Sequence, residues 1–277
     1  MSLAAVTTEH LATYRRDGVV HIPGAFGPAW VSRLRAAFDR ILADHARGAT
    51  KVRVSRFNGK IAMAEAIHHD PDYIAWARES HAGELVARVI GARRVRLFID
   101  AFFCKEGDQP ETATPIHHDL PAFCFKGQQL PSLWLALTDV GPDDAPLQCV
   151  PGSHTTDVLY RPPTSSMDLP LLPGYRERAD IPAWIKATGG ELKTYTARAG
   201  DVLVIHPATI HSSLAKTTPG GIRIAFTTRW MGDDVVWAPT IYTRTNMVKA
   251  PERLKPGDPP PDDEFPVIWP RAAATAA

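Results

Sequence analysis

The chain has 277 residues, with 31 Lys and Arg against 30 Asp and Glu, so its formal net charge of +1 offers no general attraction for nucleic acid or an anionic membrane surface. Its apolar runs are well short of the roughly 18 residues that a membrane-spanning helix needs. Its 25 prolines disfavour a helical bundle, because proline breaks helix interiors. We therefore expect neither a nucleic-acid nor a membrane partner.

The N-terminal part, residues 1–94, is predicted to be mainly helical. Apolar side chains recur at helical spacing in 8–17, in a segment that begins at Pro28, and in about 71–91. A short strand at 19–22 separates the first two of these helices. This part contains no catalytic cluster of its own.

From residue 95 the pattern changes to short β-branched and aromatic runs separated by Gly, Pro and Asp. Such runs predict a β-sandwich or barrel over 95–235, and they lie at 95–103, 133–140, 202–206 and 222–228. Residues 155–195 form a proline-containing insertion with little periodicity, which is typical of a lid or binding loop. The tail at 236–277 is expected to be extended and docked, so that residues 1–277 form one domain.

The cysteines give no sign of a disulfide framework or a CxxC zinc site. There are three, Cys104, Cys124 and Cys149, and both their odd count and their spacing argue against such sites. Each is expected to be a small buried apolar residue. The first residues contain no apolar stretch followed by a small-residue cleavage site. We accordingly expect a reducing, cytoplasmic location.

One group of metal-binding side chains is His117-His118-Asp119. On a strand successive side chains alternate between faces, so His117 and Asp119 would point the same way and His118 the opposite way. A histidine and a carboxylate on one face can occupy adjacent positions around a metal. The alternative is a surface turn in which Asp119 caps a backbone amide.

A second group lies where a Gly200-Asp201 turn leads into an apolar strand with His206 and His211 at and beyond its end. Farther along, Arg223 is embedded in the apolar strand at 222–228. A buried arginine needs an anionic partner, because an unpaired buried charge is very costly. The alternatives are an arginine on a solvated strand face and a structural salt bridge.

Together these residues fit one chemistry. Two histidines and one carboxylate form a facial triad with open positions, which suits non-haem Fe(II) oxygen chemistry. An arginine can bind the far carboxylate of a dicarboxylic co-substrate in bidentate fashion. That co-substrate would be 2-oxoglutarate.

Further motifs accompany these two groups over most of the chain. They are an opening of helix, Arg-Asp-Gly, short strand and Pro-Gly at 14–24, Leu97-Phe98-Ile99-Asp100 with Lys105, His117-His118-Asp119-Leu120, Trp134, Val150-Pro151-Gly152-Ser153-His154, Gly200-Asp201 with His206 and His211, and 229–234. In this order and spacing the chain resembles the phytanoyl-CoA dioxygenase-like family of Fe(II)/2-oxoglutarate-dependent oxygenases, in its bacterial small-molecule branch. The resemblance implies a mainly β fold with flanking helices (α+β) and a double-stranded β-helix, or cupin-like jelly-roll, core.

The resemblance also implies roles for individual residues. His117, Asp119 and His211 would be the iron ligands, with His211 preferred over His206 for its distance to Arg223. Arg223 would bind the distal carboxylate of 2-oxoglutarate with help from Ser213, and Trp134 would line the co-substrate pocket. For a further co-substrate contact from the N-terminal part, Arg56 and Lys60 are the candidates.

Several other side chains are candidates for the wall of the pocket. His154 lies in a turn that is structural in relatives, and His68 and His69 are expected at the surface or on a pocket wall. Four aromatic residues are candidates for the pocket, although core packing is favoured for them: Phe123, Phe125, Trp230 and Tyr242.

The expected activity is hydroxylation of an unactivated C–H bond in a small metabolite or natural-product intermediate, with release of succinate and CO2. O2 would be the oxidant and ascorbate an accessory reductant. The carboxylate ligand Asp119 argues against the related halogenases, which have a small residue there. The alternatives are desaturation or epoxidation with the same cofactors, a cupin-type isomerase or dioxygenase that needs no 2-oxoglutarate, and a non-catalytic jelly-roll binding protein.

Overall fold

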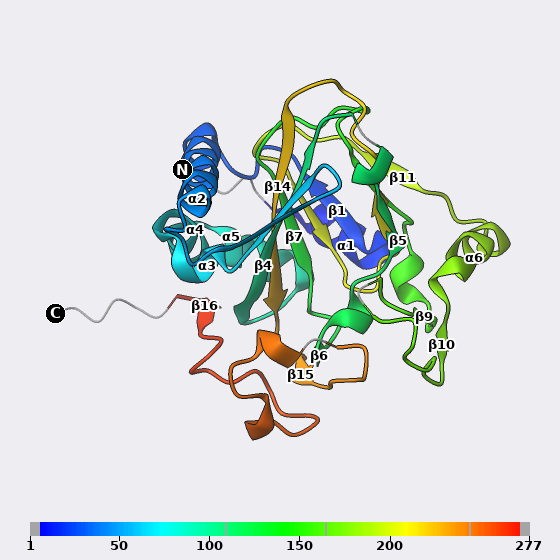
Figure 1. Ribbon diagram of the computed structural model, residues 1–277. Coiled ribbons are helices and arrows are strands. Elements are labelled where there is room, and N and C mark those ends of the chain that lie inside the picture. Colours follow the sequence, from blue (N-terminus) through cyan, green and yellow to red (C-terminus); the bar gives the residue numbers. More distant parts are fainter. Residues whose placement is uncertain (1–5, 109, 164, 244, 272–277) are drawn as a thin grey trace.

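Two antiparallel sheets face each other, and helices cover the outer face of the larger sheet (Figure 1). The computed structural model describes residues 6–271 except 109, 164 and 244. The larger sheet has the order β1-β12-β7-β14-β4-β3-β2, with β16 also paired to β4. These strands are β1 (Val19–Ile22), β12 (Val202–Ile205), β7 (Ser132–Ala136), β14 (Ile222–Met231), β4 (Val95–Glu106), β3 (Lys60–Ala64), β2 (Arg53–Phe57) and β16 (Val267–Trp269).

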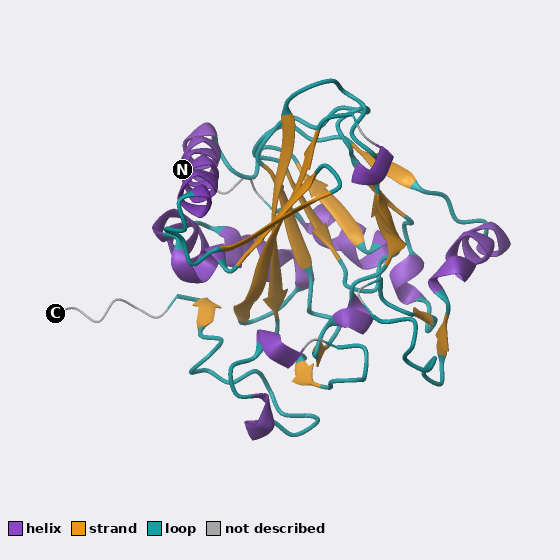
Figure 2. Ribbon diagram, viewed as in Figure 1, coloured by secondary structure: helices purple, strands orange, loops and turns teal. Residues whose placement is uncertain are grey.

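The smaller sheet has the order β11-β8-β13-β5 and lies on the opposite side of the larger sheet from the main helices (Figure 2). Its strands are β11 (Lys193–Tyr195), β8 (Leu147–Cys149), β13 (His211–Ser213) and β5 (Thr114–His117). Two short pairs complete the strands: β9 (Leu159–Tyr160) with β10 (Tyr175–Arg176), and β6 (Phe125–Lys126) with β15 (Val236–Trp237).

The α-helices are concentrated in the N-terminal part. They are α1 (Thr8–Asp17), α2 (Pro28–Ala46), α3 (Ala66–His69), α4 (Pro71–Glu79), α5 (Ala82–Ile90) and α6 (Ile181–Thr188). Short 3-10 helices are η1 (Pro110–Thr112), η2 (Leu120–Ala122), η3 (Ser153–Thr155), η4 (Arg178–Asp180), η5 (Thr245–Met247) and η6 (Pro251–Arg253). None of the helices in the described part of the chain combines the length and apolarity that crossing a bilayer requires.

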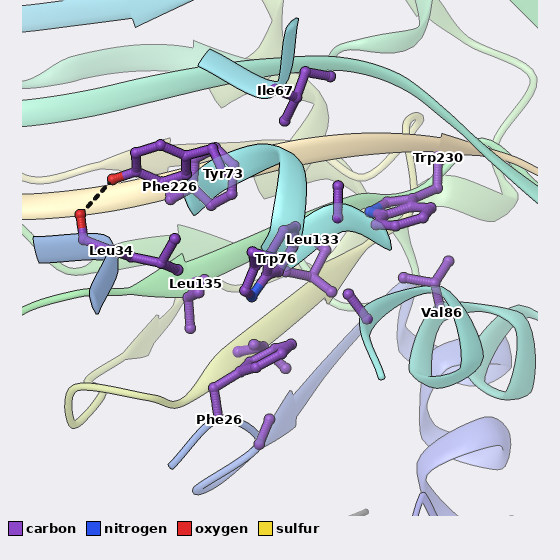
Figure 3. Packing of buried hydrophobic residues seen from close by; sticks show 14 of the residues in the cluster. Phe26, Leu34, Ile67, Tyr73, Trp76, Val86, Leu133, Leu135, Phe226 and Trp230 are labelled. Carbon is purple, nitrogen blue, oxygen red and sulfur yellow. Dashed lines mark hydrogen bonds between the residues drawn. The ribbon is translucent and has the colours of Figure 1, made fainter. Parts of the chain in front are cut away.

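The main core lies between the helices and the outer face of the larger sheet (Figure 3). Phe226 of β14 packs against the rings of Tyr73 and Trp76 of α4, with centroid separations of 4.8 and 5.1 Å. The Tyr73 hydroxyl donates a hydrogen bond to the carbonyl of Leu34 in α2 at 2.7 Å. This contact joins two helices through a buried polar group whose donor is satisfied.

Strand alternation turns the other residues of the same strands into the space between the two sheets. Trp134 and Ala136 of β7 are buried there with Leu203 and Ile205 of β12, and they pack with β8 and β11 of the smaller sheet. Polar residues of β7 and β14 on this inner face, among them Ser132 and Thr227, line a cavity between the sheets.

The structure confirms the predicted helix at 8–17 and strand at 19–22 and the mainly β fold with flanking helices. Three details differ. The β2–β3 hairpin turns at Asn58-Gly59, which both have positive φ, inside a part expected to be mainly helical. The helical stretch at 71–91 is two helices, because Ser80 leaves the helical conformation. The insertion at 155–195 contains α6, whose start and end carry Pro182 and Gly189, two ordinary helix boundary signals.

The tail also has more regular structure than expected. Its β16 pairs with β4, so this part of the tail belongs to the larger sheet. Tyr242 ties the tail to the insertion, since its hydroxyl donates to the carbonyl of Pro170 at 2.7 Å and accepts from the amide of Leu172 at 3.0 Å. The insertion is therefore held at one point by the tail.

Candidate metal centre and adjoining anion site

His117 is the last residue of β5, and Asp119 follows it in a turn. The amides of Asp119 and Leu120 both donate to the carbonyl of Pro207, at 2.9 and 2.8 Å, and this fixes the turn. Asp119 precedes η2 but makes no side-chain cap hydrogen bond, so the capping alternative is wrong. His118 points away and is buried, where its Nε2 accepts a hydrogen bond from the Tyr160 amide at 2.9 Å.

The pairing of β13 with β5 places His211 directly opposite His117. Their ring centroids are 4.3 Å apart, and the Nε2 of His117 lies 3.5 Å from Oδ1 of Asp119. Ligand atoms of the three residues all lie within 4.8 Å of one another. Two imidazoles and one carboxylate converging on one point form a donor set that non-haem iron uses.

Backbone carbonyls orient both imidazole rings. The Nδ1 atom of His117 lies 2.7 Å from the carbonyl of Pro115, and that of His211 lies 2.9 Å from the carbonyl of Thr209. A carbonyl can only accept, so each Nδ1 carries the proton and each Nε2 keeps a free lone pair. Metal-binding histidines are commonly held in this way.

The charge states also favour cation binding. Burial alone would raise the pKa of Asp119, but the adjacent His117 and the positive charge of Arg229 hold it well below its usual range. Burial, together with neighbouring His117, lowers the pKa of His211 to about 4. At neutral pH the cluster therefore has one carboxylate and a neutral His211, whose Nε2 carries no proton.

The competing histidines lie outside this cluster. The Nε2 of His206 is 3.0 Å from the side-chain oxygen of Gln128, and its Nδ1 accepts from the Ala208 amide. His154 packs against the His206 ring and its Nε2 lies 3.1 Å from the carbonyl of Arg15. Both side chains support the turn before β13.

Arg223 lies on the inner face of β14 and is almost completely buried. Its Nη1 donates to the carbonyl of Phe103 at 2.7 Å, and its Nη2 lies within 3.3 Å of the Ser213 hydroxyl and the Ala145 carbonyl. The guanidinium stands 5.8 Å from the centroid of Trp134. Within the described chain it pairs with no carboxylate, so neither the solvated face nor the structural salt bridge applies.

The sequence did not indicate a role for Lys105, which is paired with Arg223 across β4 and β14. Lys105 is buried, and its Nζ donates to the Ser213 hydroxyl at 2.7 Å and the Leu214 carbonyl at 2.8 Å. Burial, with the nearby charges of Arg223 and Lys60, lowers its pKa to about 6. Two buried basic side chains beside one hydroxyl form a site for an anion, whose charge would favour the protonated form of Lys105. The register of β4 and β14 brings Lys105 and Arg223 together, and the sequence of either strand alone does not show this pairing.

The metal cluster and the anion site share one narrow cavity of about 80 Å³. Six residues predicted from the sequence line it: His117, Asp119, Trp134, His211, Ser213 and Arg223. Arg56 and Lys60 do not. The side chain of Arg56 pairs with Glu106 at 2.8 Å near the surface, and Lys60 donates to the Ala113 carbonyl at 2.7 Å.

The four candidate pocket aromatics are buried, as core packing predicts. Phe123 and Phe125 belong to one apolar cluster and Trp230 to the main core, while Tyr242 packs against Tyr175 and Arg161 of the insertion. Arg229, which the family resemblance includes without assigning it a role, lines the cavity near Asp119. His68 and His69 lie on the wall of a second, larger hollow, in agreement with the expectation for them.

A family model described as "Phytanoyl-CoA dioxygenase (PhyH)" matches residues 14–225. A search of curated proteins gave no match. Among solved structures, the chain is similar to the non-heme alpha ketoglutarate dependent carbocyclase SnoK from nogalamycin biosynthesis. The TM-score is 0.71 and the identity 24%, with 96% of this chain and 98% of SnoK covered.

Two further solved structures have the same fold. The epimerase SnoN from nogalamycin biosynthesis has a TM-score of 0.72 and 24% identity, with 94% of this chain and 97% of SnoN covered. EctD from S. alaskensis, solved with 2-oxoglutarate and 5-hydroxyectoine, has a TM-score of 0.66 and 17% identity, with 92% of this chain and 86% of EctD covered. These similarities confirm the jelly-roll fold expected from the sequence.

Proposed function

Because this chain belongs to the phytanoyl-CoA dioxygenase family, we propose that it hydroxylates an unactivated C–H bond of a small metabolite or natural-product intermediate and releases succinate and CO2. The family identifies the chain as an iron(II)- and 2-oxoglutarate-dependent enzyme. This argues against two alternatives, a non-catalytic binding protein and a cupin-type enzyme that needs no 2-oxoglutarate. The observation that carries the proposal is one cavity that joins the His117, Asp119 and His211 cluster to the buried Arg223.

The donor set in this cavity fits iron(II). The Nε2 atoms of His117 and His211 and one carboxylate oxygen of Asp119 would hold the metal and leave its remaining positions open. When bound, the iron supplies activation of O2 and oxidation of the C–H bond. The protein keeps both rings in the unprotonated form at Nε2 through the carbonyls of Pro115 and Thr209.

The other end of the cavity fits a dicarboxylate. Arg223 and Ser213 would bind the distal carboxylate of 2-oxoglutarate, and Trp134 would form the wall beside it. The Nε of Arg223 is buried without a hydrogen-bond partner among the described residues, so the free guanidinium has unused donor capacity. Apolar Leu147 and Ile205 also line the cavity.

Other parts of the proposal concern access and location. Residues 155–195 would act as a lid, since they end in the edge strand β11 of the smaller sheet and are held by Tyr242 of the tail. The free, buried thiols of Cys104, Cys124 and Cys149 support a reducing cytoplasm. The substrate partner would be a small molecule.

Desaturation and epoxidation use the same cofactors, and the solved neighbours include a carbocyclase and an epimerase. Product analysis separates these outcomes, because hydroxylation adds one oxygen atom to the substrate whereas desaturation removes two hydrogens.

The proposal is tested by succinate formation with iron(II), ascorbate and 2-oxoglutarate and a set of candidate substrates. Asp119→Ala and His211→Ala should abolish succinate formation, because each removes a metal ligand. Arg223→Ala should raise the apparent KM for 2-oxoglutarate at least about 30-fold, since truncating one partner of a buried charged pair costs about 2 kcal/mol or more. Arg88→Ala, on the outside of α5, serves as the control. Unchanged succinate formation in Asp119→Ala would overturn the metal assignment.

A further inference from the structure

A much larger hollow adjoins the metal cavity. Its volume is about 810 Å³, which is within the range of pockets that enclose drug-sized ligands. The inner faces of β2, β3 and β4 form its floor, and α3 with the tail near η5 forms its walls. Phe103 of β4 lines both this chamber and the metal cavity, so the two spaces meet at its ring.

Phe103 is the exposed aromatic residue of β4, whose other two phenylalanines, Phe98 and Phe102, are buried. Its side chain is 43% exposed, whereas the neighbouring Phe102 on the outer face is fully buried. Strand alternation turns Phe103 inward, where it lines both cavities. An apolar surface at this position would favour an apolar or aromatic group of a bound molecule.

Arg229 stands beside this ring, on the inner face of β14. Its guanidinium carbon lies 5.5 Å from the centroid of Phe103 and 5.9 Å from that of Phe123. The residue is only 7% exposed and lines the metal cavity. Arg223 and Arg229 thus lie at opposite ends of the same cavity, one beside Ser213 and the other beside Asp119.

The hydrogen-bonding capacity of Arg229 is almost unused. Its closest carboxylate contact joins Nη2 to Oδ2 of Asp119 at 3.5 Å, which is longer than an ordinary hydrogen bond. The same oxygen is 3.3 Å from the Ser132 hydroxyl. The Nε of Arg229 is buried without a partner in the described part of the chain. A guanidinium has five donors, so leaving them without acceptors in a buried site is costly.

From these contacts we infer that Arg229 binds the substrate, and that the substrate has an apolar, ring-containing body with a carboxylate close to the carbon that is oxidised. The body would occupy the large chamber against Phe103, and the carboxylate would accept from Arg229 beside the metal. A planar guanidinium matches a carboxylate in bidentate geometry. This inference rests on the proposed function, since it takes Asp119 as a metal ligand.

The test uses 2-naphthoate and its neutral analogue 2-naphthamide as probes, measured by calorimetry under anaerobic conditions. The protein carries iron(II) and saturating 2-oxoglutarate, which keeps the probes away from Arg223. We expect wild type to bind 2-naphthoate at least tenfold more tightly than 2-naphthamide. Arg229→Met should remove this preference, Arg229→Lys should keep part of it, and Arg88→Met should behave as wild type.

A second readout separates Arg229 from the co-substrate site. Without probe, Arg229→Met should bind 2-oxoglutarate as wild type does, whereas Arg223→Met should lose that binding. The inference is overturned if wild type binds the two probes equally or binds neither, or if Arg229→Met keeps the preference. It is also overturned if Arg229→Met loses iron and 2-oxoglutarate, because Arg229 would then only position Asp119. Failure of wild type to bind 2-oxoglutarate would instead contradict the proposed function.

Discussion

At the scale of single residues, the anion site lowers the stability of the protein when no anion is bound, because two basic side chains are buried there. Lys105 and Arg223 are paired across adjacent strands, both are buried, and both contact the hydroxyl of Ser213. Burial lowers the pKa of Arg223 to about 10 and that of Lys105 to about 6. A bound dicarboxylate would supply the missing negative charge. Binding and stability therefore oppose each other at this site.

Replacing Lys105 should therefore raise the stability of the free protein and weaken the binding of 2-oxoglutarate. The pKa of Lys105 lies near 6 in the folded protein and near its ordinary value, about 10.4, in the unfolded chain. Between these pH values the unfolded chain binds a proton that the folded protein lacks, so the free energy of unfolding rises with pH. Lys105→Met removes this dependence. Without ligand it should be more stable than wild type by about 1–4 kcal/mol near pH 6.5, and the difference should shrink toward pH 10.

Denaturant unfolding at pH 6.5, 8 and 10 measures this effect. The same variant should bind 2-oxoglutarate about tenfold more weakly, because hydrogen bonds to charged groups contribute about 1.5–3 kcal/mol. Lys51→Met, at an exposed position, is the control. A stability difference that does not change with pH would show that Lys105 is charged in the folded protein across this range.

The sequence was sufficient to predict the site residues whose role follows from their immediate neighbours in the chain. The spacing of His117 and Asp119, and an arginine inside an apolar strand, were enough to bring six residues together as candidates. Lys105 and Arg229 stand in motifs of the family resemblance, but no role follows for them from the sequence because their contacts come from other strands. Their significance appears only when the fold pairs Lys105 with Arg223 and brings Arg229 beside Asp119 and Phe103.

At the scale of elements, the turn before β12 controls how that strand enters the larger sheet. Gly200 has φ of +98°, and a Cβ atom there would lie 2.2 Å from the carbonyl oxygen of Phe26. Its amide donates to the carbonyl of Ala136 and its carbonyl accepts from the amide of Phe26, both at 2.9 Å. The backbone is held on both sides, so neither partner can move away easily.

Gly200→Ala should therefore lower the free energy of unfolding by about 2–6 kcal/mol, from backbone strain and overpacking together. Gly220→Ala is the matched control. Gly220 also has positive φ, +66°, but a Cβ there meets no atom within 4 Å, so the expected loss is only about 1–2 kcal/mol. Thermal or denaturant unfolding measures both variants. Equal losses would mean that the contact with Phe26 relaxes without cost.

The elements that the sequence did not predict share a physical reason. The β2–β3 hairpin carries Asn58-Gly59, a strong turn signal, but its strands are largely exposed on one side and lack a clear apolar alternation. The helix α6 is short and amphipathic within a proline-containing stretch. Local signals were present in both cases, and packing against distant parts of the chain decided the outcome.

At the scale of the whole molecule, the helical layer and the site occupy opposite faces of the larger sheet. Phe102 and Phe226 pack outward into the helices, while Phe103, Arg223 and Arg229 point inward from the same two strands. One layer therefore stabilises the sheet, and the other face is free to hold polar groups. The mainly β class could be predicted from strand-like runs and proline content, but the jelly-roll topology came from the family resemblance.

The most direct test of this account is a crystal structure of the protein soaked anaerobically with iron(II) and 2-oxoglutarate. We predict one metal ion bound by Nε2 of His117, Nε2 of His211 and a carboxylate oxygen of Asp119. We also predict one 2-oxoglutarate with its distal carboxylate on Arg223 and Ser213. A metal ion bound by other side chains, or a distal carboxylate placed away from Arg223, would contradict the account.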